Sequence, residues 1–141
     1  MYGRRGRNFL NTLLRLARER KPLRVVADQY GAPTWSRLVA EATALAVAKQ
    51  FSPVWNSRCN GVYHLSCGGR TSWHGFAQAI LGCAQPGLPG VTVATPITTA
   101  EYPLPARRPA NSVLANARIE SAFGLRLPDW DRALATCLDE A

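Results

Sequence analysis

Two hydrophobic patterns alternate along the first fifty residues. Apolar residues beginning at Phe9 share one face at helical spacing, and they predict a helix over 9–20 with Asn8 as its N-cap. The β-branched run 23–27 predicts a buried strand, and the Ala-, Leu- and Val-rich run 36–50 predicts a second helix. This helix–strand–turn–helix order with short connections is typical of α/β folds.

An eight-residue turn, Asp28-Gln29-Tyr30-Gly31-Ala32-Pro33-Thr34-Trp35, joins the predicted strand to the second helix. Gly31 is expected to adopt a backbone conformation that bulkier residues avoid, and Thr34 or Ser36 is expected to cap the helix. Polar groups in this turn lie at the carboxyl end of a strand, where open α/β sheets usually hold ligands. A purely structural turn is the alternative.

The remainder of the chain predicts six shorter elements. They are a strand over 61–66, a helix beginning at 73 that Thr71 or Ser72 caps, a strand over 91–94, a helical turn within 97–102, a helix over 116–123 and a last helix over 130–138. Gly124 stands where a left-handed helix cap belongs. The proline-punctuated stretch 84–110 is too apolar for a disordered linker and is expected to be an ordered loop.

The composition bounds the class of protein. The chain has 141 residues and is 47% hydrophobic, which suits one domain or part of a larger one. No apolar run approaches the roughly 20 residues that span a bilayer, and no secretory signal opens the chain. We therefore expect no membrane association and a cytoplasmic location.

The net charge of +8 is concentrated near the start, where residues 1–24 carry eight Lys and Arg and a single acidic residue, Glu19. Such a basic end raises the possibility of nucleic-acid binding. Neither aromatic residues interleaved with the charges nor zinc-finger spacing accompanies it, so nucleic acid is disfavoured. A solvated helix face, or one that attracts a small phosphate-bearing ligand, is the alternative.

The usual catalytic signatures are absent from these residues. There is no Gly-x-Ser-x-Gly, no Walker loop and no Gly-x-Gly-x-x-Gly, and neither Lys21 nor Lys49 follows a tyrosine by four positions. A structural role is favoured for His64 and His74, and no third metal ligand stands at useful spacing. The four cysteines suit neither a zinc site nor a disulfide framework, and we expect reduced thiols.

One polar constellation remains, the run Pro105-Ala106-Arg107-Arg108-Pro109-Ala110-Asn111-Ser112. Arginine presents paired planar donors that suit a phosphate or diphosphate, and Asn111 and Ser112 add neutral donors and acceptors. A surface loop with solvated arginines is the alternative.

Several segments, taken in order, resemble the C-terminal part of the dTDP-4-dehydrorhamnose reductases, which are extended short-chain dehydrogenases/reductases. The segments are Tyr2-Gly3 with Gly6-Arg7-Asn8-Phe9, the run 13–17, residues 25–34 with Asp-Gln-Tyr-Gly-Ala-Pro-Thr, the run 61–65 with Thr71-Ser72-Trp73, Glu101-Tyr102-Pro103 through Arg108-Pro109-Ala110-Asn111-Ser112, and Leu127-Pro128-Asp129-Trp130. The resemblance covers nearly the whole chain.

The resemblance implies an α/β fold, with helices packed on a few short, mostly parallel strands. Residues 1–141 would form the substrate-binding part of a reductase that transfers hydride from NADPH or NADH to the C4 ketone of dTDP-4-dehydro-L-rhamnose, giving dTDP-L-rhamnose for polysaccharide synthesis. The Rossmann half that holds the cofactor and the catalytic Tyr-x-x-x-Lys would lie upstream of Met1. On this reading the chain alone contains no catalytic residue, binds no cofactor and is inactive.

The resemblance also implies a set of substrate-binding residues. Asn8 and Phe9 would border the sugar-nucleotide site, Gln29 and Thr34 would shape or line it, and Arg108 with Asn111 and Ser112 would contact the diphosphate or nucleotide. Some relatives carry a glutamate near a metal-bridged dimer contact, three residues after Pro-Thr. Arg37 occupies that position here, so no metal is expected.

One alternative function and one question of assembly stay open. The regulatory β subunit of methionine adenosyltransferase resembles the same reductases, so a non-catalytic binding protein is an alternative function. A half-sheet without neighbouring strands would expose apolar surface and open edges. We therefore expect a marginal fold, a homodimer, or a partner that supplies the missing half.

Overall fold

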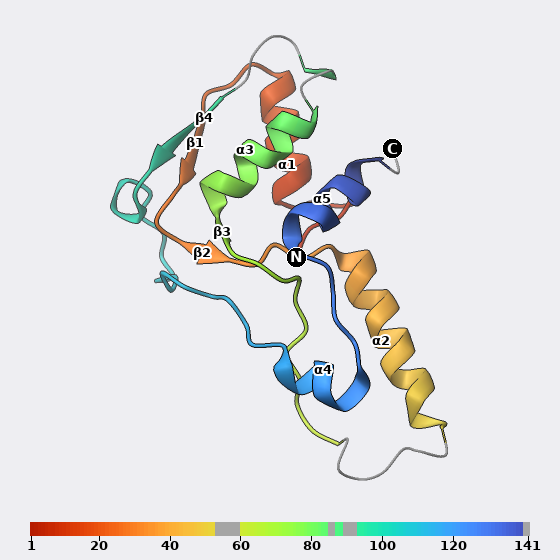
Figure 1. The fold of residues 1–141 in the computed structure, drawn as a ribbon. Helices are drawn as coiled ribbons and strands as arrows, with labels where there is room; N and C mark the ends of the chain where they lie inside the picture. The colour runs from red at the N-terminus through yellow and green to blue at the C-terminus, as the bar shows by residue number, and fades with distance from the viewer. Residues whose placement is uncertain (53–59, 85–86, 89–92, 140–141) are drawn as a thin grey trace.

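The computed structural model of the chain describes residues 1–52, 60–84, 87–88 and 93–139 (Figure 1). Its elements are α1 (Phe9–Arg18), β1 (Leu23–Val26), β2 (Tyr30–Gly31), α2 (Ser36–Gln50), β3 (Thr71–Ser72), α3 (Trp73–Ala84), β4 (Ala94–Ile97), the 3₁₀ helix η3 (Thr99–Glu101), α4 (Ala117–Phe123) and α5 (Trp130–Asp139). The fold is α/β, as the sequence predicts.

Two small sheets organise the strands. β1 pairs in parallel with β4, with Leu23 opposite Ala94 and Val26 opposite Ile97. β2 pairs antiparallel with β3, so that Tyr30 faces Ser72. Within the described ranges there are three isolated bridges, all parallel, and one of them joins Tyr30 to Asn111. The backbone of Tyr30 is therefore held between two distant segments.

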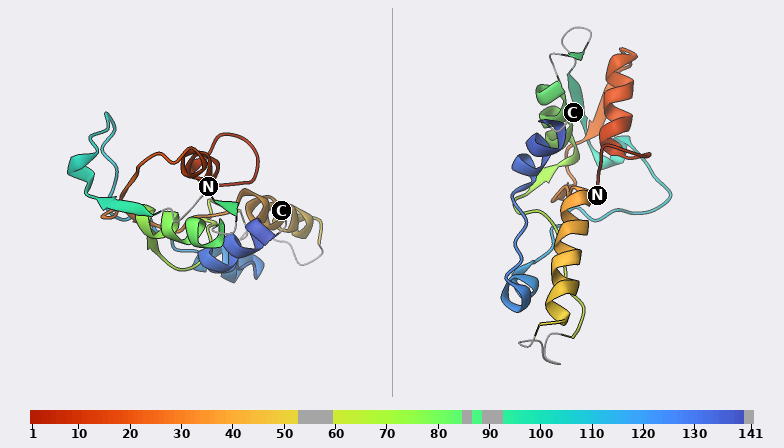
Figure 2. Two further views of the ribbon diagram at one scale, coloured as in Figure 1. Left: turned by 90° about the horizontal axis from the view of Figure 1, so that it is seen from above. Right: turned by 90° about the vertical axis from the view of Figure 1, so that its right-hand side faces the viewer.

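The hydrophobic core lies where α1, α3 and α5 come together beside β1 and β4 (Figures 1 and 2). Its largest fully buried side chains include Leu10, Phe76, Ile80 and Leu134. These residues come from the apolar faces of three helices, which is what amphipathic helices around a small sheet require. His74 on α3 ties the helix to the sheet, since its Nε2 lies 3.0 Å from the carbonyl oxygen of Ala94.

Helix α2 extends away from this core (Figure 1), and Ala42 is its only buried residue. Its apolar residues Leu45 and Val47 are exposed, and exposed Phe51 follows its last turn. A groove of about 480 Å³ separates α2 from residues 60–65 and α4. The helix was predicted correctly, but the described residues cover little of its apolar surface.

Residues 61–66 were predicted to form a strand, and that prediction is wrong. The described residues supply no backbone ladder for this segment. Side chains hold it instead: Asn116 accepts from the Ser66 N–H at 3.1 Å and donates to its carbonyl at 2.8 Å, and Arg118 donates to the Val62 carbonyl at 2.8 Å. Alternating side chains favour a strand, but pairing with a neighbour is what makes one.

Most predicted helix ends are confirmed. Asn8 caps α1 by accepting from the Asn11 N–H, Ser72 accepts from the Gly75 N–H in the first turn of α3, and α4 ends at Gly124 with φ 62°. The helical turn expected within 97–102 is η3, closed by a capping box between Thr98 and Glu101. The strand expected at 91–94 begins at Ala94 instead, and residues 91–92 lie outside the described residues.

Two expectations for the turn before α2 are wrong. The N-cap of α2 is Trp35, with no side-chain hydrogen bond from Thr34 or Ser36 to the helix. Gly31 lies in β2 without a positive φ. A Cβ at Gly31 would stand 2.9 Å from Ser112 Oγ, so a larger residue there would displace that hydroxyl.

Cys67, Cys83 and Cys137 are free thiols, as predicted, and Cys59 lies outside the described residues. No helix in the described part of the chain is long and apolar enough to cross a bilayer.

Candidate functional site

The turn after β1 is fastened to η3 by side chains. The Asp28 carboxylate accepts from both the N–H and the hydroxyl of Thr99, at 3.0 and 2.7 Å. These bonds hold the pKa of Asp28 below its usual value, the backbone N–H contributing most. The buried Gln29 amide donates to the same Thr99 hydroxyl at 3.0 Å. The turn thus has one defined position against residues seventy places further on.

Thr34 secures the other end of the turn. Its buried hydroxyl donates to the Ala32 carbonyl at 2.9 Å and accepts from the Cys67 N–H at 3.1 Å. Its carbonyl accepts from the Tyr2 N–H at 3.0 Å. Because its hydroxyl both donates and accepts a hydrogen bond within the chain, Thr34 stabilises the turn rather than offering a group to a ligand.

A first cavity of about 170 Å³ opens in front of this turn. Polar lining comes from Gln29, Thr71, Ser72 and Ser112 together with the Tyr30 side chain. The aromatic and apolar lining is Tyr2, Phe9, Pro33, Trp73 and Phe76. Hydroxyl and amide groups set against aromatic faces are typical of pockets for polyhydroxylated or heterocyclic ligands.

A second cavity, of about 380 Å³, adjoins the first, since Phe9, Gln29 and Trp73 line both. Its other lining residues include Val26 on β1, Tyr102 and Leu104, and two arginines, Arg24 and Arg108. No acidic residue is part of its lining among the described residues. We call the two cavities together the binding groove: residues with neutral hydrogen-bonding groups line one end, and Arg24 and Arg108 line the other.

Aromatic stacking holds the floor of the binding groove. The Phe9 ring lies 5.0 Å from the Trp73 ring and 5.8 Å from the Phe76 ring. Trp73 nevertheless keeps 39% of its surface exposed. Arg70 lies over the Tyr30 ring, 4.2 Å from its centroid, and orders the ring edge of the first cavity.

The seven predicted substrate-binding residues divide into two groups. Phe9, Gln29, Ser112 and Arg108 line the binding groove, whereas Asn8, Thr34 and Asn111 line neither cavity. Asn8 instead holds the glycine-bearing loop before α1, donating to the Gly3 carbonyl at 2.8 Å. Asn111 accepts from the Val113 N–H at 3.3 Å while its backbone bridges to Tyr30. Contact between a ligand and any of the seven residues stays a prediction.

The lining residues that were not among the predicted substrate-binding residues include Arg24, Trp73 and Tyr102. The sequence did point to Trp73, because Thr71-Ser72-Trp73 is one of the segments that carry the resemblance. Tyr102 also stands in one of those segments, and Arg24 closes the basic run 1–24, but their places in the groove depend on the pairing of β1 with β4 and on the return of the chain after η3.

Other candidate chemistry lies elsewhere. His74 has the structural contact described above, and His64 is exposed outside the groove. Within the described ranges no three His, Cys, Asp or Glu side chains gather as metal ligands. Arg37 pairs with Glu41 at 2.8 Å.

The fold and the groove define an α/β ligand-binding module, with short, mostly parallel strands carrying the polar turn and helices supplying the aromatic floor. Residues 1–141 match the family described as the RmlD substrate binding domain, and the chain belongs to that family.

Relatives and solved structures agree with this assignment. A dTDP-4-dehydrorhamnose reductase of Burkholderia thailandensis is 48% identical over 98% of this chain, and one of Salmonella typhimurium is 39% identical over 99%. The crystal structure of the Bacillus anthracis dTDP-4-dehydrorhamnose reductase, in complex with NADP, superposes with a TM-score of 0.85 at 31% identity over 99% of this chain. The chain spans about half of each relative: 48%, 46% and 46%, in that order.

Proposed function

We propose that this chain binds a dTDP-sugar as the substrate-binding part of a dTDP-4-dehydrorhamnose reductase. The binding groove carries the proposal, because it joins a cavity lined by neutral hydrogen-bonding groups to one lined by Arg24 and Arg108. A nucleotide sugar has this division of chemistry, with a neutral sugar linked to a diphosphate. The names of the relatives supply the particular sugar and the reaction.

The reaction proposed for the whole enzyme is hydride transfer from NADPH, or NADH, to the C4 ketone of dTDP-4-dehydro-L-rhamnose, which gives dTDP-L-rhamnose. Both the nucleotide sugar and the cofactor favour the cytoplasm as the site of action. In this reaction the residues of the groove bind and orient the substrate, with hydroxyl and amide groups at the sugar and guanidinium groups at the diphosphate.

The described residues do not fit the cofactor. Neither α2 nor α3 follows a Gly-x-Gly-x-x-Gly, and first-turn N–H groups of both helices are engaged within the chain. Ser36 N–H donates to the Tyr2 carbonyl at 2.9 Å, and Gly75 N–H donates to Ser72 Oγ at 3.0 Å. The 141 residues also lack Tyr-x-x-x-Lys. We therefore assign the cofactor and the proton donor to a nucleotide-binding half outside these residues.

The exposed apolar side of α2 supports a requirement for such a half. Leu45, Val47 and Phe51 are exposed on or next to α2, and of these three only Val47 lines the groove of about 480 Å³ between α2 and residues 60–65. A neighbouring domain or chain packed on α2 would cover these exposed apolar residues. The partner is a neighbouring domain, a second polypeptide or a second copy of this chain.

Titration of the purified chain with dTDP, dTDP-rhamnose and NADPH, followed by tryptophan fluorescence, tests the proposal. Trp73 lines both cavities, so dTDP and dTDP-rhamnose should change its emission, and NADPH should neither bind nor compete. Trp73→Phe is the matched control, because it removes the contribution of Trp73 to the emission while calorimetry still reports binding. Failure of both dTDP ligands to bind would refute the proposed function.

The alternative of a non-catalytic binding protein is separated by a second measurement. The chain is combined with the nucleotide-binding half of a relative and assayed with NADPH and dTDP-4-dehydro-L-rhamnose. Turnover supports the reductase. Binding of dTDP without turnover, in a combination that also binds NADPH, supports a regulatory protein of the same family.

A further inference from the structure

We propose that Arg24 is a second anion-binding residue of the groove, which acts with Arg108 on the diphosphate of a nucleotide sugar and is held in waiting by Glu101. The inference rests on the proposed function and deepens it. Arg24 is the last basic residue of the run 1–24, and nothing along the sequence sets it apart from the other seven. It reaches the groove because it lies on the outward-facing side of β1, between buried Leu23 and Val25.

The position of Arg24 suits a bound anion. Arg24 and Arg108 line the same cavity from opposite parts of the chain, one from β1 and the other from the segment after η3. Two guanidinium groups offer more donors than a single phosphate can use, and arginine pairs with phosphate oxygens in a planar, two-pronged geometry. A diphosphate, with two adjacent phosphate groups, matches two arginines better than a monophosphate does.

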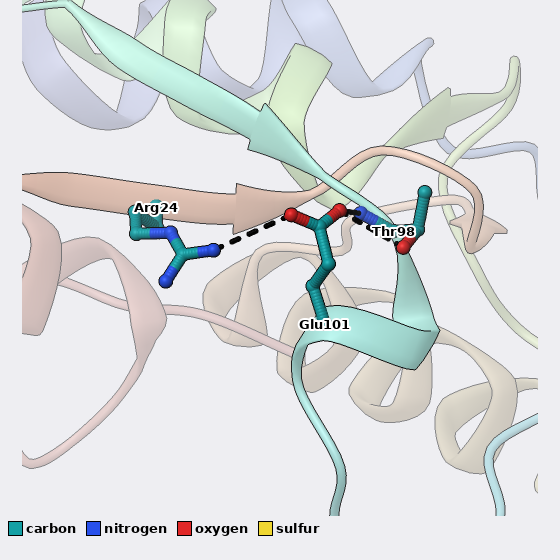
Figure 3. A network of polar contacts seen from close by, with 3 residues as sticks. All are labelled: Arg24, Thr98 and Glu101. Atoms are coloured by element: carbon teal, nitrogen blue, oxygen red, sulfur yellow. Dashed lines mark hydrogen bonds and ion pairs between the residues drawn. The ribbon is translucent and has the colours of Figure 1, made fainter.

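Glu101 bonds more closely to Thr98 than to Arg24 (Figure 3). Arg24 therefore remains available to bind an anion. One carboxylate oxygen, Oε2, accepts from the Thr98 N–H at 2.8 Å and from its hydroxyl at 2.9 Å. The other, Oε1, meets Arg24 Nη2 at 3.4 Å. The pKa of Glu101 is lowered first by the Thr98 backbone N–H, and Arg24 contributes less. Glu101 is therefore mainly a helix cap and only secondarily a partner of Arg24.

The ion pair is also weak because water reaches it. The side chains of Arg24 and Glu101 are 59% and 50% exposed, and exposed pairs of this kind contribute little to stability. A diphosphate brings more negative charge than one carboxylate and can accept from two arginines together. Arg24 thus exchanges a long bond to Glu101 for shorter ones to the ligand, whereas Glu101 keeps both bonds to Thr98.

The test compares three variants of the full 141-residue chain by calorimetry, with dTDP, dTMP, thymidine and NADP⁺ as ligands. Arg24→Gln removes the charge from the groove. Arg15→Gln is the matched control, because Arg15 is 58% exposed, pairs with Glu19 at 2.8 Å and lines neither cavity of the groove. Glu101→Gln releases Arg24, while the amide oxygen can still accept from Thr98.

Arg24→Gln should weaken dTDP binding about tenfold, the size expected for one exposed charge-assisted contact, and should change thymidine binding less than about twofold. The loss for dTMP should be smaller than that for dTDP. Glu101→Gln should bind dTDP at least as tightly as the wild type, and Arg15→Gln should match the wild type with every ligand.

The outcomes separate this inference from the proposed function. If the wild type binds dTDP and Arg24→Gln binds it as Arg15→Gln does, the role of Arg24 is overturned and the proposed function stands. If Arg24→Gln weakens thymidine as much as dTDP, the effect is not on phosphate and the inference is again overturned. If NADP⁺ binds in the wild type and loses affinity in Arg24→Gln, the arginine serves the cofactor instead. If the wild type binds no dTDP, both proposals fail.

Discussion

The hydroxyl of Tyr2 is the clearest place to test the energetics of this fold. The side chain is buried, and in the described residues its hydroxyl has no hydrogen-bond partner. The ring packs on Phe76 with centroids 5.1 Å apart, while the backbone exchanges hydrogen bonds with Thr34 and Ser36. Tyr2→Phe removes only the hydroxyl and keeps the ring contact and both backbone bonds.

A buried hydroxyl without a partner costs about 1–3 kcal/mol, so we expect Tyr2→Phe to raise the free energy of unfolding by about 1 kcal/mol near pH 8. The effect should grow in alkali. Burial, followed by the neighbouring Cys137 and Cys67, raises the pKa of Tyr2 above its ordinary value. A raised pKa means that the unfolded chain loses this proton first, so wild-type stability falls as the pH rises above about 10. At pH 11 one such proton corresponds to a further loss of about 1.4 kcal/mol, which the variant escapes.

Urea unfolding followed by circular dichroism, at pH 8 and pH 11 and at one fixed protein concentration, measures both effects. Tyr102→Phe is the control, because Tyr102 is exposed and its loss should leave stability nearly unchanged at both pH values. A Tyr2→Phe variant less stable than the wild type would mean that the hydroxyl has a partner. A gap between variant and wild type that stays constant from pH 8 to pH 11 would refute the alkaline argument.

Four further predictions concern the binding groove, the turn before α2, the exposed face of α2 and catalysis. Arg108→Ala, measured by calorimetry, should weaken dTDP binding about tenfold, since one charge-assisted contact is lost; unchanged affinity would remove Arg108 from the site. Thr34→Val should lower the free energy of unfolding by about 2 kcal/mol, because it leaves the buried Cys67 N–H unpaired, whereas Thr34→Ser should cost less; equal losses in urea unfolding would contradict this. If the exposed apolar face of α2 causes self-association, the melting temperature should rise with protein concentration, and Leu45→Lys should shift sedimentation toward monomer. A monomer with a sharp melt that does not depend on concentration would argue against self-association. The chain alone should not oxidise NADPH in the presence of the keto-sugar, and turnover by the purified chain would overturn the assignment of hydride transfer to another half.

The sequence alone determined the helices and the first strand, and it located the polar turn between β1 and α2. These are local properties, because helical spacing of apolar residues, β-branched runs and caps such as Asn8 and Gly124 act over a few neighbouring residues. The segments of the resemblance in their order also sufficed to indicate the family, because each is a short pattern readable without coordinates.

Tertiary structure decided which of the polar residues meet. Thr34 and Ser112 both have a hydroxyl. That of Thr34 is bonded to Ala32 and Cys67 behind the turn, whereas Ser112, whose hydroxyl donates to the Tyr30 carbonyl, lines the groove. Arg24 entered the site because β4 pairs beside β1 and brings Glu101 within reach. Whether residues 61–66 form a strand likewise depends on a pairing partner, which the local sequence does not encode. Hydrogen bonds between segments distant along the chain fix these outcomes, and no pattern of neighbouring residues contains them.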